Sequence, residues 1–322
     1  MSEIVLQVEN LHTSFFTRQG EVKAIDGVSF FVREGETFGI VGESGCGKSV
    51  TALSIMRLLQ EPSGQITEGK IILEGTDLVP LSKKKMRAYR GRMISMILQD
   101  PMSSLNPVYT VGNQIGESIR LHQALPDNMV EPAIIESLRL LKIPTPETML
   151  GNYPFQLSGG MRQRVVGAIA MSCRPRLLIA DEPTTALDAT IQAQYIALFQ
   201  DIQAKTNVAI IFITHDFGVV AKMCHRVGVM YAGKIVETAP TREIFKAPQH
   251  PYTSALINSV PRLDRKDERL FSIEGQPPSL LNLPPGCRFA PRCSVARETC
   301  RQQEPPEVNV GNDHTVSCWR VK

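Results

Sequence analysis

The sequence contains no apolar run long enough to span a bilayer, which requires about 20 residues. Its apolar stretches are short and interrupted, as at residues 165–171. The first four residues, Met-Ser-Glu-Ile, lack the basic segment and the long apolar core of a signal peptide. These absences predict a soluble cytosolic chain that reaches a membrane only through a partner.

The sequence also lacks a large excess of one charge and any internal repeat. A net charge of +3 is too small to argue for nucleic acid binding. A chain of 322 residues with 43% apolar residues is globular and can bury one large core and a small lobe. We therefore expect one copy of each motif described below.

Residues 42–49, which read GESGCGKS, match the phosphate-loop pattern Gly-x-x-x-x-Gly-Lys-Ser/Thr. The apolar run 37–41 before them predicts a buried strand, and helical spacing follows them. Glycines let backbone N–H groups face phosphate oxygens at a helix N-terminus, where anions are favoured. The apolar face expected for that helix consists of Val50, Leu53, Met56 and Leu59.

Lys48 can reach the β- and γ-phosphates of ATP, and Ser49 can place its hydroxyl on Mg²⁺. The thiol of Cys46 is a candidate for alkylation that blocks ATP binding. The nucleotide-binding residues that we predict in this loop are Gly42, Ser44, Gly45, Cys46, Gly47, Lys48, Ser49 and Val50.

Residues 176–182 form an apolar run that ends in two carboxylates, which is typical of a buried parallel strand. Asp181 at its end can bind Mg²⁺ through water. Glu182 is the candidate general base for the attacking water. A strand that merely ends in a solvated acidic turn is the alternative.

Two further apolar runs end in polar residues. Residues 93–98 lead into Gln99, and residues 208–213 lead into Thr214-His215-Asp216. Ligands of open α/β sheets bind outside the carboxyl ends of the strands. We therefore predict that Gln99 contacts Mg²⁺ and water, and that His215 hydrogen-bonds the γ-phosphate.

Residues 157–164, which begin Leu157-Ser158-Gly159-Gly160, resemble the signature of ATP-binding-cassette (ABC) ATPases. With the phosphate loop before it and the acidic strand end after it, the resemblance covers residues 1 to about 240. It implies an α/β fold, a P-loop ABC cassette with a RecA-like mixed sheet and a helical subdomain at about 110–165. Proline breaks in that subdomain are expected at Pro126, Pro132, Pro144 and Pro146.

The resemblance also implies roles for single residues. Gln99 marks the Q-loop, His215 is the switch histidine, and Asp188 ends the D-loop Ala186-Leu187-Asp188. Ser158, Gly159 and Gly160 bind the γ-phosphate of ATP held by a partner cassette. Phe15 stacks on adenine, with Phe16 as its rival.

Two segments resemble the ATPases of oligopeptide and dipeptide importers specifically. They are residues 100–107, which follow Gln99, and the stretch 250–256, which reads HPYTSAL. The second lies in an extension, residues 241–322, that is rich in proline and cysteine. Relatives of this kind work with a second, different ATPase subunit, two membrane permeases and an extracellular or periplasmic binding protein, at the inner face of the cell membrane.

This resemblance predicts an ATPase that drives oligopeptide or dipeptide import. The same engine with nickel, a metal chelate or an oligosaccharide as cargo is the nearest alternative. A soluble ABC protein of translation or DNA repair is a more distant one, because such proteins usually carry two cassettes or a long coiled coil. An iron–sulfur protein whose ATPase is redox-regulated is another.

Seven cysteines occur, and the last four lie close together in the extension. Structural disulfides are rare in the cytosol, so four thiols near one chain end predict a metal-binding lobe with few regular elements. Four cysteines suit zinc or an iron–sulfur cluster. The importer resemblance favours a 4Fe–4S cluster, with zinc and free thiols as alternatives. The predicted ligands are Cys287, Cys293, Cys300 and Cys318.

Overall fold

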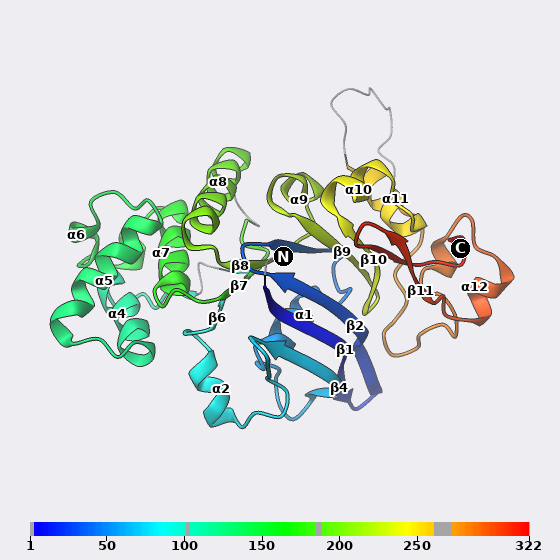
Figure 1. The fold of residues 1–322 in the computed structure, drawn as a ribbon, viewed down its shortest axis with the longest axis horizontal. Coiled ribbons are helices and arrows are strands. Elements are labelled where there is room, and N and C mark those ends of the chain that lie inside the picture. The colour runs from blue at the N-terminus through cyan, green and yellow to red at the C-terminus, as the bar shows by residue number, and fades with distance from the viewer. Residues whose placement is uncertain (1–2, 101–103, 185–187, 261–271, 322) are drawn as a thin grey trace. The chain divides into compact units, whose positions relative to one another are not determined.

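A computed structural model describes residues 3–100, 104–184, 188–260 and 272–321 of the chain (Figure 1). Contacts between residues divide the chain into two compact units. The first unit consists of Met1–Leu6, Val32–Thr37 and Leu73–Ile213, and the second of Gln7–Phe31, Phe38–Ile72 and Thr214–Lys322. Among the described residues, no helix combines the length and apolar character needed to cross a membrane.

Three parallel strands form the centre of the first unit, in the order β8-β7-β6. They are β6 (Ile94–Ile97), β7 (Leu177–Asp181) and β8 (Ala209–Thr214). All residues of β7 and β8 are buried, as expected for parallel strands covered on both faces. The three strands predicted from apolar runs are therefore confirmed, and their carboxyl ends meet at one edge.

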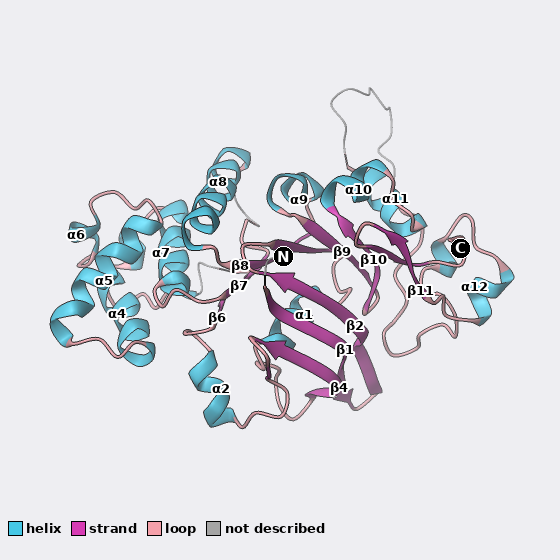
Figure 2. Ribbon diagram, viewed as in Figure 1, coloured by secondary structure: helices cyan, strands magenta, loops and turns pink. Residues whose placement is uncertain are grey.

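Most other elements of the first unit are helices, and Figure 2 shows α4 to α7 grouped together. Short polar residues start several of them: Thr110 accepts from Asn113 N at α4, and Ser158 accepts from Met161 N at α7. The helical elements are α2 (Lys83–Tyr89), α4 (Val111–His122), α5 (Asp127–Leu140), α6 (Pro146–Met149), η1 (Pro154–Gln156), α7 (Gly159–Met171) and α8 (Ala189–Thr206).

The helix break expected at Pro132 is absent. Pro132 lies inside α5, whereas Pro126 and Pro146 stand at helix starts as expected. Pro132 lacks the N–H that would bond the carbonyl of Asn128 four residues earlier. Asn128 and Pro132 are both exposed, so water can satisfy that carbonyl and the helix continues.

The second unit contains a mixed sheet in the order β11-β12-β10-β9-β3. Strand β3 (Thr37–Val41) pairs in parallel with β9 (Arg226–Tyr231), and β10 (Lys234–Pro240) pairs antiparallel with β9. The last two strands, β11 (Glu307–Gly311) and β12 (His314–Ser317), join this sheet beside β10. The extension therefore has more regular structure at its end than its composition predicts.

A second sheet has the order β2-β1-β4, and most of its residues belong to the second unit. Its strands are β1 (Ile4–Thr17), β2 (Gly20–Arg33) and β4 (Gly64–Leu73), with the short β5 (Thr76–Asp77) at its edge. The remaining helices of the second unit are α1 (Lys48–Ile55), α9 (Phe217–Met223), α10 (Thr241–Lys246), α11 (Pro251–Asn258), η2 (Ala290–Arg292) and α12 (Glu298–Gln302).

Helix α1 follows the phosphate loop as predicted, but it buries a different face. Val50 and Leu53 are only half-buried, whereas Thr51, Ser54 and Ile55 are buried. Two hydrogen bonds allow this: Thr51 Oγ1 donates to the Gly47 carbonyl at 3.0 Å, and Ser54 Oγ to the Val50 carbonyl at 2.7 Å. A buried hydroxyl costs little once it is hydrogen-bonded.

Candidate active site

The phosphate loop connects β3 to α1 in the second unit. Gly47 is the N-cap of α1, with φ of 111° and no side-chain cap. A helix start without a side-chain cap offers its first N–H groups to an anion. Gly42 must be glycine because its φ is 157° and a Cβ there would lie 2.1 Å from the Met230 carbonyl oxygen.

Lys48 lies inside the loop with 5% of its surface exposed. Its Nζ donates to the carbonyls of Gly42 at 2.8 Å and Glu43 at 3.0 Å. Phosphate oxygens form stronger, charge-assisted hydrogen bonds than carbonyls do, so the same ammonium is placed to bind them.

The sequence predicts a reactive thiol at Cys46, and the structure argues against rapid reaction. Cys46 is 5% exposed, and burial raises the pKa of its thiol. The nearby Lys48 ammonium, 3.8 Å from Sγ, opposes this pKa shift without overcoming it. Because the thiolate is the nucleophile, a buried thiol with a raised pKa is slow to alkylate.

The other predicted residues of the second unit are His215 and the two aromatics. His215 directly follows β8 and is exposed, and Asp216 after it caps α9. Phe15 is half-buried beside Gly64, where an added Cβ would lie 2.8 Å from its Cε1 atom. Phe16 is 47% exposed. Either ring remains a predicted adenine contact.

In the first unit, Gln99, Asp181 and Glu182 come together where β6 and β7 end. Asp181 is the last residue of β7 and is 4% exposed. Gln99 Nε2 donates to Glu182 Oε2 at 3.3 Å. The structure therefore joins the predicted Q-loop glutamine directly to the predicted general base.

Glu182 has a strained backbone. Its φ is 47°, in the left-handed region, and its N–H donates to the Ile213 carbonyl of β8 at 2.9 Å. A non-glycine residue in this conformation costs about 1–2 kcal/mol. Such strain is concentrated at functional sites, and here the bond to β8 fixes the backbone of the predicted base.

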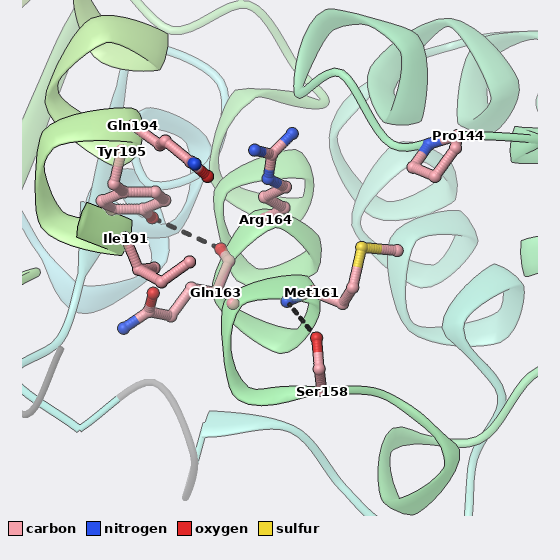
Figure 3. Close-up of a pocket in the computed structure, with 9 residues that line it drawn as sticks. Pro144, Ser158, Met161, Gln163, Arg164, Ile191, Gln194 and Tyr195 are labelled. Carbon is pink, nitrogen blue, oxygen red and sulfur yellow. Dashed lines mark hydrogen bonds between the residues drawn. The ribbon is translucent and has the colours of Figure 1, made fainter. Parts of the chain in front are cut away.

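The signature residues lie at the start of α7, beside a cavity of about 290 Å³ (Figure 3). Ser158 caps α7, and Tyr195 from α8 donates its hydroxyl to the Gln163 carbonyl at 3.3 Å. Burial raises the pKa of Tyr195, so its hydroxyl stays neutral. The cavity is lined by Pro144, Ser158, Gly160, Met161, Gln163, Arg164, Ile191, Gln194 and Tyr195.

Asp188 is the N-cap of α8, and its Oδ1 accepts from Thr190 N and Ile191 N, both at 3.0 Å. Ala186 and Leu187 of the predicted D-loop lie outside the described residues. Pro101, within the predicted importer segment 100–107, lies outside them as well.

Sequence reasoning missed two residues that contact the phosphate loop. Tyr252 belongs to the stretch 250–256 and accepts a hydrogen bond from Glu43 N at 3.0 Å. Arg292 directly precedes Cys293 and forms an ion pair with Glu43 at 2.6 Å. No local pattern signals either contact, because both partners lie more than 200 residues away.

The four cysteines of the extension line one small cavity, together with His250, Phe289 and Trp319. Burial raises the pKa of the Cys287, Cys293 and Cys318 thiols, and the other cysteines raise it further. Among the described residues, no three His, Cys, Asp or Glu side chains are arranged to hold a single metal ion. The structure thus gathers the predicted ligands but does not form an ion site.

Comparisons with known proteins agree with this arrangement. Residues 25–185 match the family model "ABC transporter", and residues 236–300 match "Oligopeptide/dipeptide transporter, C-terminal region". The chain is 53% identical over 317 residues to "Dipeptide transport ATP-binding protein DppD" of Bacillus subtilis, covering 98% of this chain and 95% of that protein. It is 51% identical over 316 residues to "Oligopeptide transport ATP-binding protein OppD" of the same organism, covering 98% and 88%.

A solved structure supports the fold. The ATP-binding cassette MJ0796, in a dimer bound to ADP and Pi, matches with a TM-score of 0.65 and 24% identity. The match covers 74% of this chain and 99% of that one. The phosphate loop, the acidic strand end and the two family matches together show that this chain belongs to the ABC transporter family, as an ATP-hydrolysing cassette with the C-terminal region of oligopeptide/dipeptide transporters.

Proposed function

We propose that this chain hydrolyses ATP to power the import of oligopeptides or dipeptides, at the cytoplasmic face of the cell membrane. The observation that carries the proposal is the 53% identity, over nearly the whole chain, to a protein named for dipeptide transport. The match of residues 236–300 to a region named for oligopeptide and dipeptide transporters supports the same cargo. Nickel, metal chelates or oligosaccharides are the rival cargoes.

In this proposal, the described residues divide the chemistry among them. Lys48 and the loop N–H groups bind the phosphates, and Glu182 accepts a proton from the attacking water. Gln99, which donates to Glu182 at 3.3 Å, orients that carboxylate. His215 hydrogen-bonds the γ-phosphate, and Phe15 stacks on adenine, with Phe16 as the rival ring.

The proposed Mg²⁺ ligands are the Ser49 hydroxyl, the Asp181 carboxylate and the Gln99 amide oxygen. Their chemistry fits, because Mg²⁺ prefers oxygen ligands and keeps several waters. When bound, the ion neutralises charge that develops on the phosphates. Asp181 is almost fully buried at the end of β7.

We propose that each ATP lies between two cassettes. Ser158, Gly159 and Gly160 of one chain then bind the γ-phosphate held by the other, next to the cavity at the start of α7. Gly159 has no atom within 4 Å of an added Cβ, so its backbone is open to an approaching phosphate. Asp188 lies at the proposed contact between cassettes. A related but different chain is the expected partner.

The proposed transporter also contains two membrane permeases and an extracellular or periplasmic binding protein. Val108 and Tyr109, between Gln99 and α4, are 71% and 53% exposed. Exposed apolar side chains at neighbouring positions in the sequence suit a protein contact. We assign this segment to the contact with a permease.

Substitution of the general base tests the ATPase mechanism. Glu182→Gln keeps the side-chain shape but removes the base, so we expect ATP hydrolysis to fall by about 10²–10⁴-fold while ATP binding is retained. ATP should then hold two cassettes together in size-exclusion chromatography. Glu136→Gln, on the exposed surface of α5, is the matched control. Hydrolysis by Glu182→Gln at the control rate would exclude Glu182 as the base.

Cargo is tested separately, in the complex that co-purifies with the chain. We expect its binding protein to stimulate ATP hydrolysis when loaded with short peptides. Stimulation by Ni²⁺, a metal chelate or an oligosaccharide, with none by peptides, would replace the proposed cargo and leave the ATPase assignment intact.

For the cysteine lobe we propose a 4Fe–4S cluster held by Cys287, Cys293, Cys300 and Cys318, with zinc as the alternative. Sulfurs around one tetrahedral zinc lie about 3.8 Å apart, given Zn–S bonds of about 2.3 Å. A four-iron cluster spaces its ligand sulfurs farther apart. The observation that supports a group held by all four thiols is that they line one cavity.

Metal and sulfide analysis of anaerobically purified chain tests the cysteine proposal. We expect iron and acid-labile sulfide, with visible absorbance that is lost in a Cys300→Ser variant. Zinc without iron would exclude the cluster. If the cluster is present, transport measured before and after its oxidation tests the redox-regulated alternative.

A further inference from the structure

Glu43 of the phosphate loop is held by three different groups. Its N–H donates to the Tyr252 hydroxyl at 3.0 Å, and its carbonyl accepts from Lys48 Nζ at 3.0 Å. Its carboxylate accepts two N–H groups from Arg292, at 2.6 Å and 3.0 Å. Two of these three partners, Tyr252 and Arg292, belong to the C-terminal extension.

Arg292 is fixed in this position by further contacts. Its Nε donates to the Glu274 carbonyl at 3.0 Å, and its Nη2 also contacts the Ile273 carbonyl at 3.3 Å. Its Nη1 also contacts the Tyr231 hydroxyl at 3.4 Å. The side chain is 4% exposed. A buried, two-pronged guanidinium with every nitrogen paired differs from a surface ion pair, because its orientation is fixed.

Arg288 contacts the residue beside a second attachment point of the loop. It donates to the Ala232 carbonyl and to Asp26. Gly233, which follows Ala232, donates its N–H to the Cys46 carbonyl of the loop at 2.8 Å. Arg288 follows Cys287 and Arg292 precedes Cys293, so both arginines adjoin predicted cysteine ligands. Arg292 contacts the loop itself, and Arg288 contacts Ala232 beside Gly233.

We propose that Arg292, assisted by Tyr252, is a positioning residue for the phosphate loop, and that ATP affinity depends through it on the order of the cysteine lobe. Two physical effects act in the same direction. Arg292 neutralises the Glu43 carboxylate, which otherwise repels the triphosphate. It also holds the loop in one conformation, and affinity falls in proportion to the fraction of molecules that have the binding-competent one.

This inference goes beyond the proposed cargo and depends on neither the peptide nor the identity of the metal. It requires only that the phosphate loop binds ATP. Arg292 itself is not assigned any contact with ATP, so it is expected to change binding rather than the chemical step.

The test uses the full chain with Arg292→Gln, Arg292→Lys and Tyr252→Phe, purified alone for binding and within its co-purified complex for hydrolysis. Titration with a fluorescent ATP analogue gives Kd, and steady-state hydrolysis gives KM and kcat. We expect Arg292→Gln to raise Kd and KM about tenfold, a typical coupling between two sites, with kcat at saturating ATP within about twofold. Arg292→Lys keeps the positive charge but cannot donate two parallel hydrogen bonds to Glu43. Its Kd should therefore lie between those of the wild type and Arg292→Gln. Arg301→Gln, an exposed arginine on α12, is the matched control.

A double-mutant cycle separates positioning from a general structural effect. Adding Glu43→Gln to Arg292→Gln removes the unpaired carboxylate, so we expect Kd to recover partly. Cys293→Ser should raise Kd in the wild-type background and add nothing in the Arg292→Gln background, because the lobe acts through Arg292.

Several results would overturn the proposal. The first is an unchanged Kd for Arg292→Gln, and the second is a fall in its kcat with Kd unchanged. The third is that Cys293→Ser raises Kd by the same factor in the wild-type chain and in the Arg292→Gln chain. If Arg292→Gln does not fold, Arg292→Lys and Tyr252→Phe decide, each with an expected rise in Kd of about threefold. If the Kd values of both variants then equalled that of Arg301→Gln, the proposal would be refuted.

Discussion

Replacing Glu237 with glutamine is expected to loosen the C-terminal extension, because this fully buried carboxylate attaches two segments of the extension to β10. Glu237 lies in β10 and its side chain is 0% exposed. Its Oε1 accepts from Gln249 N at 2.7 Å and from His314 Nε2 at 2.8 Å, and its Oε2 accepts from His250 N at 3.0 Å. Thus the start of α11 and the strand β12 are both attached to β10 through one side chain.

The size of the effect follows from these contacts. Glutamine keeps the shape of the side chain but has only one acceptor oxygen. Its NH₂ group therefore replaces one carboxylate oxygen and faces a buried N–H donor, which loses its acceptor. Leaving a buried donor unpaired costs about 1–3 kcal/mol, and hydrogen bonds to a charged group contribute about 1.5–3 kcal/mol each. We therefore expect Glu237→Gln to lower the free energy of unfolding by about 2–4 kcal/mol.

The only tryptophan of the chain, Trp319, provides the assay. Its indole N–H donates to the Gln303 carbonyl at 3.0 Å, so its fluorescence reports the structure of the extension. Urea unfolding followed at Trp319 should show a lower midpoint for Glu237→Gln. The exposed Glu307→Gln on β11 is the control, with an expected change within about 0.5 kcal/mol. Equal midpoints for the two variants would refute the reasoning.

Three further predictions concern the nucleotide site. Because burial raises the pKa of the Cys46 thiol, alkylation by iodoacetamide, followed by mass spectrometry, should be slow at pH 7 and accelerate as the pH rises; rapid labelling at pH 7 would contradict this. Gly42→Ala should abolish ATP binding through its clash with Met230, whereas Gly45→Ala, with no atom within 4 Å and φ of 78°, should cost only about 1–2 kcal/mol in thermal unfolding. If Gly42→Ala and Gly45→Ala lost ATP binding equally, the clash with Met230 would not be the cause. Gly160→Ala meets a side chain only at 3.7 Å, so we expect unfolding to change by less than about 0.5 kcal/mol while ATP hydrolysis falls. Hydrolysis at the wild-type rate would remove Gly160 from the proposed contact with the partner's ATP.

The parallel strands and the phosphate loop could be predicted because their signals are local. Short apolar runs marked β3, β6, β7 and β8, since strands buried on both faces are mostly apolar. The last three of these runs also end in polar residues. The sequence also predicted that Gln99 and Glu182 lie at one edge of the sheet, because parallel strands bring their carboxyl ends together. The hydrogen bond between them was found only in the structure.

Other features could not be predicted, because they depend on contacts between distant residues. The buried face of α1 includes Thr51 and Ser54, whose hydroxyls find partners in the fold, and hydrophobic spacing alone favours the wrong face. The left-handed backbone of Glu182 leaves no mark on the sequence either. Arg292 and Glu43 are 249 positions apart, and neither residue type at its position indicates the other.

The contacts of the phosphate loop explain why its unit contains the end of the chain. At Cys46 the loop is held by Gly233, and at Glu43 it is held by Tyr252 and Arg292. Contacts accordingly place Phe38–Ile72 and Thr214–Lys322 in one unit. The predicted boundary at residue 240 follows a change in composition, but the hydrogen bonds of the loop cross it. The extension therefore packs against the phosphate loop, and this contact is the route by which we propose that a change in its cysteine lobe reaches the predicted ATP site.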